Sequence, residues 1–213
     1  MKRIIRILTL LFLLVTTWFS AFSTAILVPM DMDQKNHLKA YGIAYFAVKE
    51  GFDASWLLNY RGGSFMFAYS STVEDECIIR GVSYQVIADV QANTIRQEIA
   101  AVENNMNEIK LTKVPKIAVY SPKNKLPWDD AVTLVLTYAE IPYDVIYDEE
   151  VIKGDLPKYD WLHLHHEDFT GQYGKFWGSY RNAAWYIQDV KENEERAQLL
   201  GFSKVSEMKL AVV

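Results

Sequence analysis

Strand and helix signals alternate between Lys116 and Lys175, and this alternation constrains the fold more than any other feature of the 213-residue chain. An apolar run at 117–120 is followed by a turn, by Pro127 and by an apolar helical segment. Two further strand-like runs lie at 143–147 and 159–164. Strands that alternate with helices predict an α/β fold with a doubly wound, mostly parallel sheet.

The N-terminal half shows the same alternation. Apolar positions at helical spacing and capping residues predict helices, and short apolar runs predict strands. The predicted elements are a helix at 36–50, strands at 56–60 and 65–69, a helix from Ser71, a strand at 83–87 and a helix from Asp89. A polar stretch at 103–113 is the predicted junction between two regions, 24–112 and 113–213, which form either one domain or two.

The C-terminal end points to an incomplete domain. The last predicted helix begins near Glu207, and the chain ends at Val213 in an apolar run. A doubly wound sheet needs a further strand after such a helix. We therefore expect the α/β region to lack its C-terminal part.

Residues 1–23 have the features of a secretory signal. A basic start precedes an apolar stretch, and small residues at its end predict cleavage before Thr24. The alternative is an uncleaved membrane anchor, because no charged residue occurs between Ile7 and Asp31. Both alternatives predict export across the inner membrane, to the periplasm, the outer surface or the medium.

Composition excludes some classes of partner. Removal of residues 1–23 takes away three positive charges and no acid, which changes the formal net charge from −5 to −8. Nucleic acid is excluded, because phosphate binding needs clustered Lys and Arg. Cys77 is the only cysteine, so an exported chain has no internal disulfide and depends on its core. The expected partner is a small molecule, with membrane contact only through an uncleaved signal segment.

Four runs carry a resemblance to a known family: NHLKAYGIAYF, WLLNYRGGSF, PKIAVYSPKNKLPWDDAVTLVLTYAEIPYDVIYDEE and LPKYDWLHLHHEDFTGQYGKF. Through them, residues 26–213 resemble exported Bacteroidota proteins that often carry the name asparagine synthetase B. The resemblance implies a flavodoxin-like, class I glutamine amidotransferase-like sheet and a hydrolase or amidotransferase that acts on a small molecule. In that fold the loop after the third strand, here 166–174, helps to form an oxyanion hole.

The chain differs from true asparagine synthetases in two respects. Lys2 stands where those enzymes have a cysteine after the initiator methionine, and no SGGxDS-type pyrophosphate loop occurs. Cys77 lies within a predicted helix and not at a nucleophile elbow. Two function classes stay open: a hydrolase or amidotransferase, and a non-catalytic envelope protein that binds a ligand or a partner.

The candidate site lies after the third predicted strand, because doubly wound sheets place their chemistry at the carboxyl ends of the strands. The candidate catalytic residues are His163, His165, His166, Glu167 and Asp168. Imidazole and carboxylate groups suit acid-base catalysis and zinc ligation. His163 and His165 share a strand face, so at most two of the three histidines meet one ligand. Alternatively, these side chains hydrogen-bond the loop and the neighbouring strands.

Further candidates for ligand binding lie on other loops. They are Arg61, Gly62, Gly63 and Ser64, together with Ser121 after the first strand and Gly171 after the third. A guanidinium and glycine amides can hold an anion, whereas Gly-Gly between two strands is also typical of a turn. We expect Arg61 and Ser121 to lie on loops next to the histidines. The sequence specifies neither a metal nor a cofactor.

Overall fold

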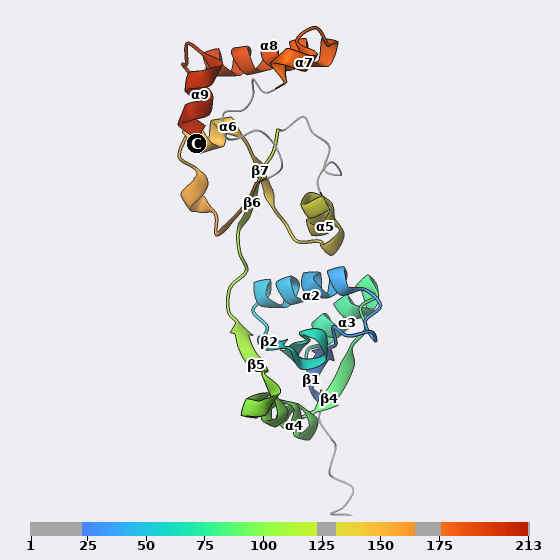
Figure 1. Ribbon diagram of the computed structural model, residues 1–213. Coiled ribbons are helices and arrows are strands. Elements are labelled where there is room, and N and C mark those ends of the chain that lie inside the picture. Colours follow the sequence, from blue (N-terminus) through green and yellow to red (C-terminus); the bar gives the residue numbers. More distant parts are fainter. Residues whose placement is uncertain (1–22, 123–130, 165–175, 213) are drawn as a thin grey trace, which may run out of the picture. The chain divides into compact units, whose positions relative to one another are not determined.

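The computed structural model describes residues 23–122, 131–164 and 176–212. The chain divides into two compact units, one that ends at Val114 and one that begins at Pro115. The first unit has a five-stranded sheet and the second a three-stranded sheet (Figure 1). Within the described ranges, no helix is both long and apolar enough to cross a membrane.

The sheet of the first unit is antiparallel throughout. Its strands are β1 (Ser23–Val28), β2 (Ala54–Leu58), β3 (Phe65–Ala68), β4 (Gln85–Ala88) and β5 (Asn107–Leu111). They are ordered β4-β1-β3-β2-β5, and each neighbouring pair is antiparallel. With the two helices between them, β1 to β4 have the βαββαβ connectivity of a split βαβ, or ferredoxin-like, motif. β5 adds an edge strand to this motif.

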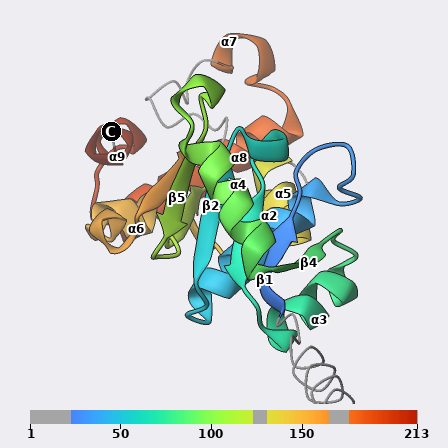
Figure 2. The same cartoon turned by 90° about the horizontal axis from the view of Figure 1, so that it is seen from below.

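Helices cover both faces of this sheet (Figures 1 and 2). α2 (His37–Lys49) and α3 (Ser71–Arg80) pack on one face, and α4 (Asp89–Ala100) packs on the other. Because strand side chains alternate between faces, Ile26 and Phe67 join the core under α2 and α3, whereas Leu27 and Met66 join the core under α4. Two 3₁₀ turns, η1 (Tyr60–Gly62) and η2 (Val102–Asn104), complete the unit.

The sheet of the second unit is small and parallel. β6 (Ile117–Tyr120) lies between β7 (Asp144–Ile146) and β8 (Trp161–Leu164). All of β6 is buried: Ile117 and Val119 pack with α5 (Ala131–Ala139), and Ala118 and Tyr120 pack on the opposite face. The other helices are α6 (Asp148–Ile152), η4 (Leu156–Lys158), α7 (Trp177–Tyr180), α8 (Ala184–Leu199) and α9 (Val205–Val212).

The prediction of one doubly wound, mostly parallel sheet is wrong. In the first unit, each helix connects strands that are not neighbours, since β3 lies between β1 and β2, and β1 lies between β3 and β4. A short loop at 59–64 joins β2 to β3 and reverses the chain, which makes the neighbouring strands antiparallel. Alternation of helices with strands does not distinguish this arrangement from a doubly wound sheet.

β1 and β5 have no counterpart among the predicted strands. The apolar residues of β1 continue the run assigned to the signal segment. β5 lies in the polar stretch predicted as a junction, where Glu108 and Lys110 alternate with Ile109 and Leu111 on an edge strand. An edge strand with one polar face carries only a weak apolar signal.

Candidate functional site

His163 is the one candidate at the end of the third parallel strand that lies within the described residues. The others, His165, His166, Glu167, Asp168 and Gly171, lie outside them. His163 is half-buried in β8 and pairs with Val119 of β6. The Ser121 amide donates to the Ile146 carbonyl at 3.0 Å, which extends the ladder between β6 and β7. Two residues beyond Val119, Ser121 therefore lies on the sheet face of His163.

Arg61 lies in the first unit, where two acids occupy its guanidinium. Its Nε donates to Asp31 Oδ2 at 2.6 Å, and a terminal nitrogen pairs with Asp33. The hydrogen bond from Arg61 lowers the pKa of the Asp31 carboxyl, and the same bond raises the pKa of Arg61. Arg61 thus connects the β2–β3 turn to the segment after β1.

The other residues of this turn also make internal contacts. Gly62 has φ of 81°, and a Cβ at this position would overlap the Met30 carbonyl oxygen, so glycine permits the close approach of two backbones. The Gly63 carbonyl accepts from Trp56 Nε1 at 3.1 Å. The Ser64 hydroxyl donates to carbonyl oxygens within the turn. In this structure Arg61 to Ser64 form a turn that packs on its own unit.

Within the described residues, Cys77 does not form a nucleophilic site, and no metal-binding cluster is found. Cys77 is fully buried in α3, and burial raises the pKa of its thiol to about 12. A thiol with this pKa is protonated at neutral pH and is a poor nucleophile. Over the ranges that the structure describes, no three side chains of His, Cys, Asp or Glu gather in an arrangement that could hold a metal ion.

A buried ionic cluster, which we name the Asp148 network, lies where β6 and β7 end. Asp148 is fully buried; it accepts from the Tyr120 hydroxyl at 2.6 Å and from Lys209 Nζ at 3.0 Å. Arg196 lies 3.6 Å from the same carboxylate, and both cations lie over the ring of Tyr147. Burial and the contact with Asp148 raise the pKa of Tyr120. Arg196 Nε also lies 3.5 Å from Glu149, so two acids face two cations, and this balance of charge favours a structural role for the network.

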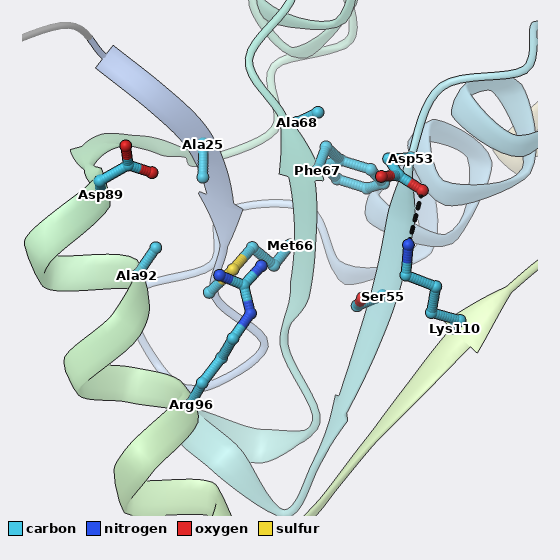
Figure 3. Close-up of a pocket in the computed structure, with 10 residues that line it drawn as sticks. All are labelled: Ala25, Asp53, Ser55, Met66, Phe67, Ala68, Asp89, Ala92, Arg96 and Lys110. Carbon is cyan, nitrogen blue, oxygen red and sulfur yellow. Dashed lines mark hydrogen bonds and ion pairs between the residues drawn. The ribbon is translucent and has the colours of Figure 1, made fainter.

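A hollow of about 130 Å³ opens in the first unit between α4 and the sheet (Figure 3). We name it the α4 hollow. Its floor contains Ala25 of β1, Ala68 of β3 and Ala92 of α4, whose side chains end at Cβ and leave space. Met66 and Ser55 complete the floor, so the α4 hollow has an apolar base with one hydroxyl in it.

Charged side chains of both signs surround the α4 hollow. Asp89 and Arg96 come from α4, and Asp53 and Lys110 come from the sheet side. Lys110 Nζ lies 2.9 Å from Asp53 Oδ1, but the two side chains are 65% and 70% exposed, and such a pair contributes about 0–1 kcal/mol. Arg96 meets Glu108 through Nε at 3.4 Å. These contacts are weak enough for a ligand to replace them.

Ser55 gives the floor its polar character. The residue is only 6% exposed, and its backbone pairs with Met66 on one side and Lys110 on the other. Among the described residues, none makes a hydrogen bond with its hydroxyl group. Ser55 Oγ is not one of the fully buried side-chain atoms without a partner, so its hydroxyl is accessible from the hollow, where water can satisfy it. A polar molecule in the α4 hollow can take the place of that water.

The α4 hollow thus combines an apolar base, one hydroxyl and charged side chains of both signs. No protein-family model matches the sequence, and no match was found among curated proteins or among solved structures.

Proposed function

We propose that this protein is an exported, non-catalytic ligand-binding protein that holds a small polar molecule in the α4 hollow. The Ser55 hydroxyl is the observation that carries the proposal, because it lies in the floor of the hollow, is accessible from it and has no hydrogen-bond partner among the described residues. An engineered apolar cavity of about 150 Å³ binds benzene, so a hollow of about 130 Å³ suits a molecule, or a portion of one, with about six heavy atoms.

The pattern of residues 1–23 supports export as part of this proposal. β1 begins at Ser23, and its pairing with β3 begins at Ala25. Cleavage before Thr24 therefore removes Ser23, which is paired with Ala88 of β4, and leaves every paired residue between β1 and β3 in place. An exported binding protein would then expose the α4 hollow to the periplasm or the medium.

Calorimetric titration of the purified protein with a panel of small polar metabolites tests the proposal. We expect at least one compound to bind, and Ser55→Ala to raise its Kd about three- to tenfold, which is the contribution of one hydrogen bond. Thr94→Ala is a matched control, because it removes an exposed hydroxyl from α4 outside the α4 hollow. The proposal fails if no compound binds, or if Ser55→Ala binds as tightly as the Thr94→Ala control.

A second candidate function is hydrolysis or amide transfer at the carboxyl edge of the parallel sheet. One observation favours it: Ser121 and His163 share a face on neighbouring strands, where α/β sheets often carry their chemistry. A hydroxyl and an imidazole are the groups of a nucleophile and its base. Product release from a panel of amides and esters tests this candidate, and Ser121→Ala and His163→Ala should each abolish it. Unchanged turnover in both variants would reject it.

A further inference from the structure

The acidic and basic residues around the α4 hollow are attached at different positions along the strands. The Ala68 amide donates to the Asp53 carbonyl at 3.0 Å, and Ala68 is paired with Ala25, so these three residues form one row across the sheet. Lys110 is paired with Ser55, two residues beyond Asp53, and these two belong to the next row. Such rows are about 7 Å apart, because a strand rises about 3.4 Å per residue. The acid thus lies in one row and the base in the next.

The charged residues of α4 follow the same order, with an acid first and a base further along. α4 begins at Asp89, directly after β4, whose end is paired with the start of β1, so Asp89 lies at the Asp53 end of the α4 hollow. Arg96 follows two helical turns later and reaches Glu108, beyond the row of Lys110. Asp89 and Arg96 lie toward opposite ends of the hollow, and the guanidinium lies beside Met66 (Figure 3). Asp53 and Asp89 are therefore attached at one end of the α4 hollow and Lys110 and Arg96 toward the other, while Lys110 Nζ reaches back to Asp53 and Arg96 Nε meets Glu108.

We infer that the α4 hollow selects a small zwitterion, a molecule with an ammonium group and a carboxylate a few ångströms apart, such as a small amino acid. This inference rests on the ligand-binding function proposed above. The ammonium lies toward Asp53 and Asp89, and the carboxylate lies toward Arg96 and the Ser55 hydroxyl. An anion alone meets the two acids and a cation alone meets the two bases, whereas a zwitterion has both of its charges complemented.

The groups that bind charge are available to this ligand. Arg96 uses Nε toward Glu108, and the remaining N–H groups of its planar fork match the geometry of a carboxylate. The Asp89 carboxylate makes no hydrogen bond or ion pair with any other residue in the described ranges. Lys110 and Asp53 are exposed partners, so their pair opens at little cost.

Titration calorimetry with three matched probes tests the inference. Alanine carries both charges, propionate carries only the carboxylate, and ethylamine carries only the ammonium. We expect alanine to bind the wild type at least about tenfold more tightly than either single-charge probe, since each charge-assisted hydrogen bond contributes about that factor. Glycerol is the neutral probe of similar size.

Variants on α4 test which residue binds the carboxylate of the ligand and which binds its ammonium group. Arg96→Gln should weaken the binding of alanine and propionate about tenfold or more and leave ethylamine unchanged, whereas Asp89→Asn should weaken alanine and ethylamine and leave propionate unchanged. Arg96→Lys keeps the charge without the planar fork and should weaken alanine binding less than Arg96→Gln. Glu98→Gln, on α4 outside the α4 hollow, and Asp75→Asn, on α3, are controls for the loss of an acid.

The outcomes separate this inference from the proposed function. Glycerol binding that Ser55→Ala weakens, without any binding of alanine, overturns the zwitterion and leaves ligand binding intact. Alanine binding that is unchanged in both Arg96→Gln and Asp89→Asn also overturns the zwitterion inference. If none of the four probes nor any compound of the metabolite panel binds the wild type, the inference and the proposed function fail together.

Discussion

Replacement of Lys209 by methionine tests whether the Asp148 network holds α9 on the second unit. The side chain of Lys209 is 4% exposed, and its Nζ lies 3.0 Å from the fully buried Asp148 carboxylate. Removal of one partner from a buried ion pair costs about 3–5 kcal/mol, because the other charge stays buried. We expect about 3 kcal/mol for Lys209→Met, since the Tyr120 hydroxyl and Arg196 remain beside Asp148.

Hydrogen exchange followed by mass spectrometry measures this change where it occurs. A loss of about 3 kcal/mol lowers the protection of amides that open with the second unit roughly 150-fold, because 1.4 kcal/mol is a factor of ten. Peptides from β6 and α9 should show the loss, while peptides from β1 and β3, in the first unit, serve as an internal reference. Lys191→Met is the matched control, since its 3.7 Å pair with Glu195 is exposed and contributes less than about 0.5 kcal/mol.

A double variant distinguishes pairing from packing. In Asp148→Asn/Lys209→Met, both charges are gone and the amide oxygen still accepts from the Tyr120 hydroxyl. We expect this variant to be more stable than Lys209→Met alone, within about 1.5 kcal/mol of the wild type. The argument is refuted if Lys209→Met exchanges like the Lys191→Met control, or if the cost in the double variant equals the sum of the two single costs.

Three further predictions concern the turn, the thiol and the N-terminus. Gly62→Ala should destabilise the first unit by roughly 2 kcal/mol more than Gly51→Ala in urea unfolding, because both glycines have φ of 81° but only a Cβ at position 62 meets backbone; equal losses would contradict this. Because burial raises the Cys77 pKa to about 12 from about 8.5 in an unfolded chain, the folded protein holds this proton more tightly, and stability should fall as pH rises from about 9 to 12. The same slope in Cys77→Ala would show that other groups cause it. Mass spectrometry of protein from the native host should find an N-terminus near Thr24, whereas a retained Met1 in the membrane fraction supports the anchor.

Local signals in the sequence locate the strands better than they locate strand partners. β6, β7 and β8 coincide with the apolar runs predicted at 117–120, 143–147 and 159–164. In the first unit, β3 coincides with the run predicted at 65–69, and β2 begins two residues before the run predicted at 56–60. The partner of β2 on its other side is β5, about 50 residues further along the chain. No local pattern encodes that pairing, because it depends on which helix covers which face of the sheet.

No sequence motif indicates the α4 hollow, because its lining residues come together only through the pairing of distant strands. Asp53 and Lys110 are 57 residues apart, and each alone is an ordinary surface charge. The alternation of side chains along a strand does place polar residues together in pairs. Asp53 and Ser55 share one strand face, and so do Glu108 and Lys110. These two pairs indicate a common polar surface only once the strand register, which pairs Ser55 with Lys110, is known. Within the Asp148 network, Asp148 directly follows the apolar run predicted at 143–147 and so has the position of a strand-end residue, whereas no pattern near Lys209 indicates that it is buried.

The arrangement of helices explains why a polar hollow can open on the face of the sheet that α4 covers. Five strands about 4.8 Å apart span roughly 19 Å, whereas a helix with its side chains is about 10 Å wide, so full cover of one face takes two helices. The face under α2 and α3 has two, but the opposite face has α4, which contacts β4, β1 and β5 and so crosses the sheet obliquely (Figure 2). The corner beside its first turns stays open, which is why Asp53 and Lys110 are tolerated on a face whose centre is apolar. A longer side chain at Ala68 should fill this corner, so Ala68→Leu is expected to abolish ligand binding while the antiparallel sheet stays folded.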